Sequence, residues 1–186
     1  MTINGSQVRI TEVGPRDGLQ NESVRIPTAI KIEFVDQLSA AGFPEIEVTS
    51  FVSAKWVPQL GDASEVMRGI TRRAGTIYSA LVPNERGLED ALEARVDKVS
   101  VFVSATEGFS KHNTNGSIDE VIARIAPVVS RARTAGKPVR GYVSCIVGCP
   151  YDGPVDPAQV VAVCARLLEM GVDEIDLGDT IGAADA

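Results

Sequence analysis

A short segment near the start of the chain, Gly14-Pro15-Arg16-Asp17-Gly18-Leu19-Gln20-Asn21-Glu22, carries residue types that can do chemistry. The guanidinium of Arg16 is always charged and binds a carboxylate or a developing oxyanion through two parallel N–H donors. The carboxylate of Asp17 is a hard oxygen ligand for a metal ion. The segment therefore suits a metal held beside an anionic, carbonyl-bearing substrate. A surface turn with a local Arg16–Asp17 ion pair fits the same residues.

The composition bounds the class of protein. The chain has 186 residues, 44% of them hydrophobic, and a formal charge of −7, which fits one sizeable globular core. Asp and Glu outnumber Lys and Arg by 25 to 18, which argues against nucleic acid as a partner. Every apolar stretch is far shorter than the roughly 20 residues that cross a bilayer, so we expect no membrane partner either.

The N-terminal residues and the cysteines indicate a compartment. Residues 1–6 have neither the basic nor the apolar region of a signal peptide. The three cysteines are odd in number and lack a disulfide-scaffold spacing, which favours a reducing environment. We therefore expect a cytoplasmic protein.

Strand-like and helix-like segments alternate along the chain. The expected strands, rich in β-branched residues, are 8–13, 45–49, 77–82, 96–103, 139–147 and 172–177. The expected helices are 28–41, 62–73, 84–94, 117–135 and 157–170. Such alternation predicts a parallel sheet with helical crossovers. Ser117 is the expected N-cap of the fourth helix, and left-handed C-caps are expected at Gly42, Gly75, Gly136 and Gly171.

Polar and glycine-containing segments follow the strands, at 14–23, 49–61, 104–116, 148–156 and 178–182. Open α/β sheets and (β/α)8 barrels both place their sites at that end. The dinucleotide-binding fingerprint fails at Gly14 and Gly18, so a TIM barrel is favoured. A whole barrel needs about 250 residues. We therefore expect residues 1–186 to form a single catalytic barrel domain with only about the first six βα units, incomplete at the C-terminus.

Six stretches at the strand exits resemble, in order, those of the 3-hydroxy-3-methylglutaryl-CoA lyase family of metal-dependent, aldolase-like barrel lyases. The stretches are 13–22, Ile46-Glu47-Val48-Thr49-Ser50-Phe51-Val52-Ser53, Lys55-Trp56-Val57-Pro58-Gln59, 139–145, Gly148-Cys149-Pro150-Tyr151 and Gly178-Asp179-Thr180-Ile181-Gly182. The resemblance implies a retro-Claisen cleavage of an acyl-CoA thioester to acetyl-CoA and acetoacetate, assisted by a divalent cation, Mg²⁺ or Mn²⁺.

The resemblance also implies roles for residues. Asp17 would ligate the cation, Arg16 would stabilise the thioester enolate, and Glu47 would orient Arg16 or a metal-bound water. The alternatives are that Glu47 lies at an edge or surface and that Asp179 caps a following helix. The remaining substrate-binding residues implied are Gln20, Ser50, Tyr142, Asp179 and Thr180.

Other functions are compatible with the same residues. A lyase for a related 3-hydroxy-3-alkylglutaryl-CoA, or a condensing synthase joining acetyl-CoA to a 2-oxo acid, would use the same metal. A third hypothesis is a barrel fragment without enzymatic activity. The family's His-x-His metal pair and catalytic cysteine loop are absent from these residues, so we expect the 186 residues alone to be inactive. A homodimer is left open.

Four further side chains have simple structural interpretations. Trp56 is expected to pack within its loop. Cys145 is expected to be a small core residue, and neither Cys145 nor Cys149 is expected to hold zinc or to be the family's catalytic cysteine. His112, the one histidine, is expected in a solvated loop.

Overall fold

The structure, a computed structural model, describes residues 2–3 and 6–184. It divides the chain into two compact units. The first contains the chain up to Leu81 together with Glu89–Lys98, and the second contains Val82–Leu88 and the chain from Val99 onward.

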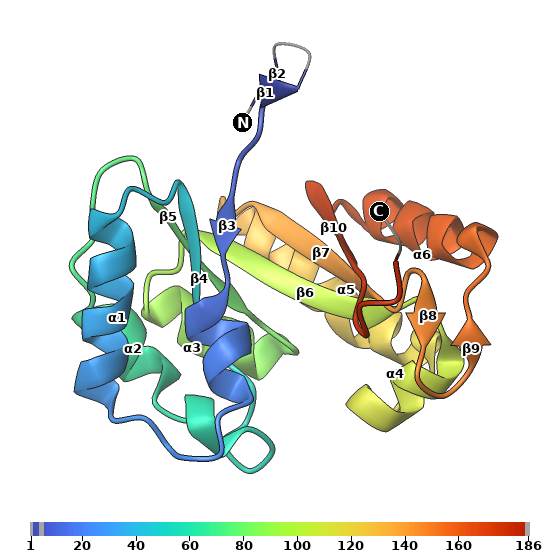
Figure 1. The fold of residues 1–186 in the computed structure, drawn as a ribbon, viewed down its shortest axis with the longest axis horizontal. Helices are drawn as coiled ribbons and strands as arrows, with labels where there is room; N and C mark the ends of the chain where they lie inside the picture. The colour runs from blue at the N-terminus through green and yellow to red at the C-terminus, as the bar shows by residue number, and fades with distance from the viewer. Residues whose placement is uncertain (1, 4–5, 185–186) are drawn as a thin grey trace. The chain divides into compact units, whose positions relative to one another are not determined.

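The first unit consists of short parallel strands covered by two helices. Strands β3 (Thr11–Glu12), β4 (Glu45–Ser50) and β5 (Ile77–Leu81) pair in parallel. Helices α1 (Thr28–Ala40) and α2 (Ala63–Gly69) lie side by side and pack on β4 (Figure 1). A π-helical turn, Gly14–Gly18, follows β3, and a 3-10 turn, Pro58–Leu60, precedes α2. Strands β1 (Thr2–Ile3) and β2 (Ser6–Gln7) form a separate hairpin.

The second unit has longer helices. Strands β6 (Lys98–Ser104), β7 (Val139–Ser144) and β10 (Glu174–Gly178) pair in parallel, and α5 (Ile118–Thr134) and α6 (Pro157–Met170) pack on β7. Helix α4 (Glu107–Thr114) follows β6, and β8 (Gly148–Cys149) and β9 (Gly153–Pro154) form a small antiparallel hairpin (Figure 1). Helix α3 (Glu85–Glu93) begins in the second unit and ends in the first.

The main sheet confirms the expected parallel order. The strands follow the chain order in each unit, β3-β4-β5 in the first and β6-β7-β10 in the second. The core is aliphatic, as the 5% content of aromatic residues suggests; examples are Val35, Ile46, Met67, Val128, Val143 and Leu167. Among the described residues, no helix is both long and apolar enough to cross a membrane.

The helix signals were mostly correct. Ser117 caps α5 through a capping box, in which its hydroxyl accepts from Glu120 N–H and the Glu120 carboxylate accepts from Ser117 N–H. Such a box satisfies two donors that a helix start leaves open. The four glycines expected at helix ends all have positive φ, which only glycine adopts cheaply, but Gly75 lies in the turn before β5 and caps no helix, because α2 ends at Gly69.

Three local expectations were wrong. The strand expected at 8–13 pairs in the main sheet only at Thr11–Glu12. The helix expected at 62–73 ends at Gly69, because Ile70 is extended. The loop expected at 104–116 contains α4, so His112 lies on a helix, where it is exposed and stacks on Tyr151 at 3.9 Å between ring centroids.

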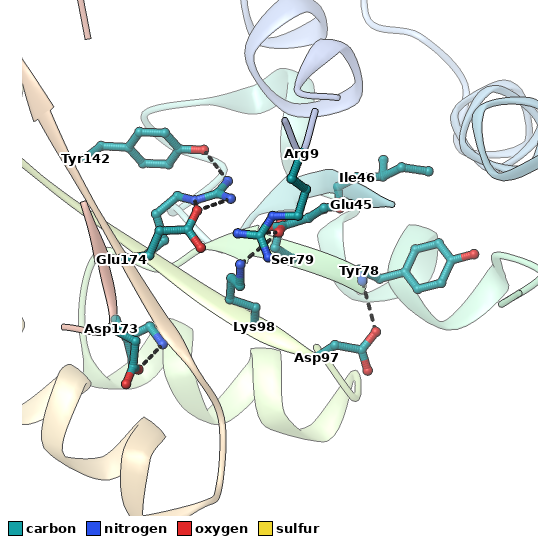
Figure 2. A network of polar contacts seen from close by, with 12 residues as sticks. Arg9, Glu45, Ile46, Tyr78, Ser79, Asp97, Lys98, Tyr142, Asp173 and Glu174 are labelled. Carbon is teal, nitrogen blue, oxygen red and sulfur yellow. Dashed lines mark hydrogen bonds and ion pairs between the residues drawn. The ribbon is translucent and has the colours of Figure 1, made fainter. Parts of the chain in front are cut away.

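Charged side chains are buried at the beginnings of several strands. In the first unit, Lys98 and Glu45 point toward each other and pair at 2.7 Å (Figure 2). In the second, the Arg140 guanidinium donates twice to Glu174, at 2.8 and 2.6 Å. A buried charge is tolerated only when it is paired and hydrogen-bonded, so each of these two pairs compensates a buried charge.

A second buried pair of the first unit fixes the loop that follows β4. The Lys31 ammonium, on α1, donates to Asp62 Oδ1 at 2.6 Å and to the carbonyl of Gln59. Thr28 donates to the other carboxylate oxygen of Asp62 at 2.7 Å. Burial acts to raise the pKa of Asp62, but the hydrogen bonds from Lys31 and Thr28 outweigh it and hold that pKa below 3.8. The pair therefore ties α1 to the start of α2.

We expect Asp62→Asn to lower the free energy of unfolding by about 3–5 kcal/mol, because it leaves the Lys31 ammonium buried without its counter-charge. The folded-state pKa of Asp62 is depressed, so its contribution is present above pH 3.8 and is lost as the pH falls through the lower folded-state value. Urea unfolding at neutral and acidic pH measures both effects. Glu65→Gln, an exposed carboxylate of α2, is the matched control; equal effects of the two substitutions would contradict the assignment.

Candidate active site

The Arg16–Asp17 pair lies on a tight π-helical turn at the exit of β3. The N–H groups of Arg16 and Asp17 both donate to the carbonyl of Val13, at 3.1 and 2.7 Å. Pro15, buried within the turn, limits its backbone freedom. Because the backbone of the turn is fixed in this way, the directions of the two charged side chains are fixed as well.

Arg16 bridges two carboxylates of very different exposure. Its Nε donates to Glu47 Oε1 at 2.5 Å, and its Nη1 donates to Asp17 Oδ1 at 2.7 Å. The side chain of Glu47 is fully buried, that of Arg16 is 13% exposed and that of Asp17 is 56% exposed. A carboxylate buried in a central strand needs a cation. Glu47 therefore fixes the guanidinium, while Asp17 stays open to solvent.

A β-bulge in β4 places Ser50 on the same face as Glu47. Ser50 lies three positions after Glu47 in the sequence, and strict alternation would put the two on opposite faces. The pairing with β5 shifts between Glu47 and Thr49, so that Glu47 pairs with Ser79 and Ser50 pairs with Leu81. Ser79 and Leu81 share a face, and the bulge therefore brings Ser50, which is fully buried, to that face as well.

Two residues that the sequence reasoning missed support this turn. Glu12 accepts a hydrogen bond from Gly14 N–H at 2.6 Å, and a Cβ at position 14 would lie 2.8 Å from that carboxylate oxygen. The side chain of Gln59 donates to the carbonyl of Glu22 at 3.0 Å and so joins the loop after β4 to the loop after β3. Gln20 lies half-buried just past the turn.

The other three expected substrate residues lie in the second unit. The half-buried Tyr142 accepts a hydrogen bond from Arg140 Nη1 at 3.3 Å through its hydroxyl (Figure 2). Thr180 Oγ1 accepts from the N–H of Cys145 at 2.8 Å. Asp179 accepts from the N–H groups of Ala183 and Ala184, and these bonds lower the pKa of Asp179. Thr180 and Asp179 thus fix the backbone at the exits of β7 and β10.

The sulfur of Cys149 accepts several hydrogen bonds that the sequence did not predict. Its sulfur accepts hydrogen bonds from the Thr106 hydroxyl at 3.1 Å and from the N–H groups of Tyr151 and Asp152 at 3.4 and 3.3 Å. Burial acts to raise the pKa of Cys149, but these donors outweigh it and lower that pKa below its ordinary value. Burial raises the pKa of Cys145, which matches its expected place in the core.

The comparisons with known proteins agree on one family. The HMGL-like family profile matches residues 7–186. The cytoplasmic 3-hydroxy-3-methylglutaryl-CoA lyase of Rattus norvegicus is 55% identical over 175 residues, which are 94% of this chain and 51% of the rat protein. The chain belongs to the HMGL-like family.

Two further relatives extend this likeness. A 3-hydroxy-3-isohexenylglutaryl-CoA/hydroxymethylglutaryl-CoA lyase of Pseudomonas aeruginosa is 54% identical over 180 residues, 97% of this chain and 60% of that protein. The crystal structure of the HMG-CoA lyase from Brucella melitensis superposes with a TM-score of 0.94 at 54% identity, over 95% of this chain and 62% of that one. The fold is therefore the TIM barrel of the HMGL-like family. The chain spans about half the length of the curated relatives it matches.

The described residues of this HMGL-like chain offer few ligands for a metal ion. No group of three or more His, Cys, Asp or Glu side chains that could hold one occurs in residues 6–184. Asp17 has an open carboxylate at the strand-exit edge, and it fits as one hard oxygen ligand of a divalent cation.

We expect Thr106→Val to raise the pKa of Cys149, because it removes the hydroxyl donor and keeps the shape of the side chain. A pH titration of thiolate absorbance, with Cys145 and Cys164 replaced by alanine, measures that pKa. Thr134→Val, which removes an exposed hydroxyl on α5, is the control. A pKa that does not move would show that the Thr106 hydroxyl is no donor to the sulfur.

Proposed function

We propose that the protein is a carbon–carbon lyase that cleaves 3-hydroxy-3-methylglutaryl-CoA to acetyl-CoA and acetoacetate. The observation that carries the proposal is a guanidinium held by the buried Glu47 carboxylate beside the open Asp17 carboxylate, at the exit of β3. The relatives in the HMGL-like family named as such lyases support it.

The reaction sets clear demands on the site. The tertiary hydroxyl of the substrate loses its proton, and the oxygen electrons form the ketone of acetoacetate. The adjacent C–C bond breaks, its electron pair forms the enolate of the acetyl thioester, and a proton then converts the enolate to acetyl-CoA. Charge therefore moves onto the thioester oxygen, and a fixed cation placed there lowers the barrier.

Arg16 would provide that cation. Glu47 holds its Nε, so the guanidinium is oriented before substrate binds and needs little reorganisation as charge develops. Ser50, brought to the same face as Glu47, and Gln20 would bind the substrate. Tyr142 would extend the polar surface, with Asp179 and Thr180 fixing the backbone around it.

Asp17 would hold the divalent cation, Mg²⁺ or Mn²⁺. When bound, such an ion lowers the pKa of the substrate hydroxyl and stabilises the alkoxide. The contact between Arg16 Nη1 and Asp17 Oδ1 leaves the second carboxylate oxygen of Asp17 for that ligation.

The size of the 3-alkyl group on the substrate is a second point. The Pseudomonas aeruginosa relative is named for both the methylglutaryl and the isohexenylglutaryl thioester. A larger 3-alkyl group is therefore an alternative substrate of the same reaction. The other alternative is a condensing synthase, which forms a C–C bond between acetyl-CoA and a 2-oxo acid instead of breaking one.

We also propose a cytoplasmic protein, with a homodimer as the assembly to be tested. The three cysteines are free thiols in the structure, and the rat relative is named as cytoplasmic. A reducing compartment keeps such thiols free.

The function is tested with the protein purified from its own source, supplied with Mg²⁺. One arm contains 3-hydroxy-3-methylglutaryl-CoA and is assayed for acetoacetate; the other contains acetyl-CoA and a 2-oxo acid and is assayed for free coenzyme A. Acetoacetate formation in the first arm alone is the expected result. Turnover in the second arm alone, or in neither, would contradict the proposal.

We expect Arg16→Met to lower kcat by about 10²–10³-fold or more, the loss typical of a missing oxyanion donor. The KM should change less, because the interaction strengthens as charge develops. Arg25→Met, at an exposed arginine of the following loop, is the matched control. Thermal unfolding of both variants separates lost chemistry from lost folding, and an active, folded Arg16→Met protein would contradict the assigned role.

A further inference from the structure

Trp56, the single tryptophan of the chain, does not pack within its loop as its sequence context suggests. Its side chain is 75% exposed. Indole is a large apolar group, and leaving it in water forgoes the stabilisation that its burial would give. Loops on a rigid scaffold carry many binding residues, and tryptophan is enriched at binding surfaces.

The backbone that carries Trp56 is fixed by other residues. The N–H groups of Trp56 and Val57 both donate to the carbonyl of Ser53, at 2.9 and 3.1 Å. Leu60 is buried at the end of the loop, and the Lys31 ammonium donates to the carbonyl of Gln59. The indole is therefore not needed to hold the loop in place.

The loop lies at the same end of the first unit as the candidate active site. It begins directly after Ser50, the last residue of β4. Gln59 joins it to the carbonyl of Glu22, at the end of the segment that carries Arg16 and Asp17. Trp56 lies six positions after Ser50, which limits the distance between their Cα atoms to about 20 Å.

The charge of this loop differs from that of the chain. Residues 51–61 contain one charged side chain, Lys55, whereas the whole chain carries −7. The Lys55 ammonium lies 5.6 Å from the centre of the Trp56 ring. A flat indole next to an ammonium suits a ligand that joins an aromatic base to phosphate, since bases stack on aromatic rings and phosphates pair with cations.

We propose that Trp56 and Lys55 bind the adenine nucleotide end of the coenzyme A thioester, with adenine stacked on the indole and a phosphate paired with Lys55. This inference rests on the proposed function, which supplies a substrate with that chemistry. It assigns the two side chains to substrate binding and leaves the reacting atoms to the Arg16 turn.

Comparison with the Trp56→Phe variant isolates the emission of Trp56. Its fluorescence is followed while coenzyme A, ADP or pantetheine is added, and binding of each is measured independently by calorimetry. Coenzyme A and ADP should quench the emission with saturation, and pantetheine should not. Trp56→Leu should weaken coenzyme A binding about tenfold, in the range of one lost stacking contact, and Trp56→Phe should restore most of it. Pantetheine binding should be the same in all variants.

A matched control and two contrary outcomes complete the test. Tyr151→Leu replaces another exposed aromatic, in the second unit, and should leave coenzyme A binding unchanged. Coenzyme A binding without any change in Trp56 fluorescence would overturn the inference and leave the proposed function standing. No binding of coenzyme A at all would overturn both. An emission shift that depends on protein concentration without ligand would assign Trp56 to contact with a second copy, which would also overturn the inference.

Discussion

The buried ion pair between Arg16 and Glu47 is the interaction on which the first unit and its chemistry depend. Glu47 is fully buried in β4, and leaving such a carboxylate without a cation costs about 3–5 kcal/mol. Its cation comes from the turn after β3, so the sheet and the turn stabilise each other. The same contact orients the guanidinium before any substrate arrives. Structure and proposed catalysis therefore share one constraint.

Much of the fold could be predicted from local signals. Alternating strands and helices, the capping residue Ser117 and the glycines at helix ends are encoded within a few residues of chain, and the structure has them. Helix α4 was missed, because its sequence, Glu107–Thr114, is polar and lacks an apolar period. In addition, the N–H of Gly108, in the first turn of α4, donates to Asp152 at 2.7 Å. The two residues are 44 positions apart, so the local sequence does not predict this contact.

The sequence predicted which residues form the candidate site better than it predicted how they are arranged. The Arg16–Asp17 motif and the buried position of Glu47 followed from the sequence and the family resemblance. The bulge that turns Ser50 to the face of Glu47 depends on the pairing register of β4 with β5, which alternation alone does not reveal. The donors around the Cys149 sulfur come from two chain segments, the Thr106 hydroxyl and the N–H groups of Tyr151 and Asp152, and only the fold brings the two segments together.

The central claim is that Glu47 acts on the reaction through Arg16, as a positioning residue. A double-mutant cycle in kcat/KM with Arg16→Lys, Glu47→Gln and the double variant tests it most directly, with thermal unfolding of each variant as the check on folding. Arg16→Lys keeps the charge but loses the planar donors that Glu47 fixes. If the claim is correct, the double variant is no slower than the slower single variant. Independent loss, in which the two fold-reductions multiply, would contradict it.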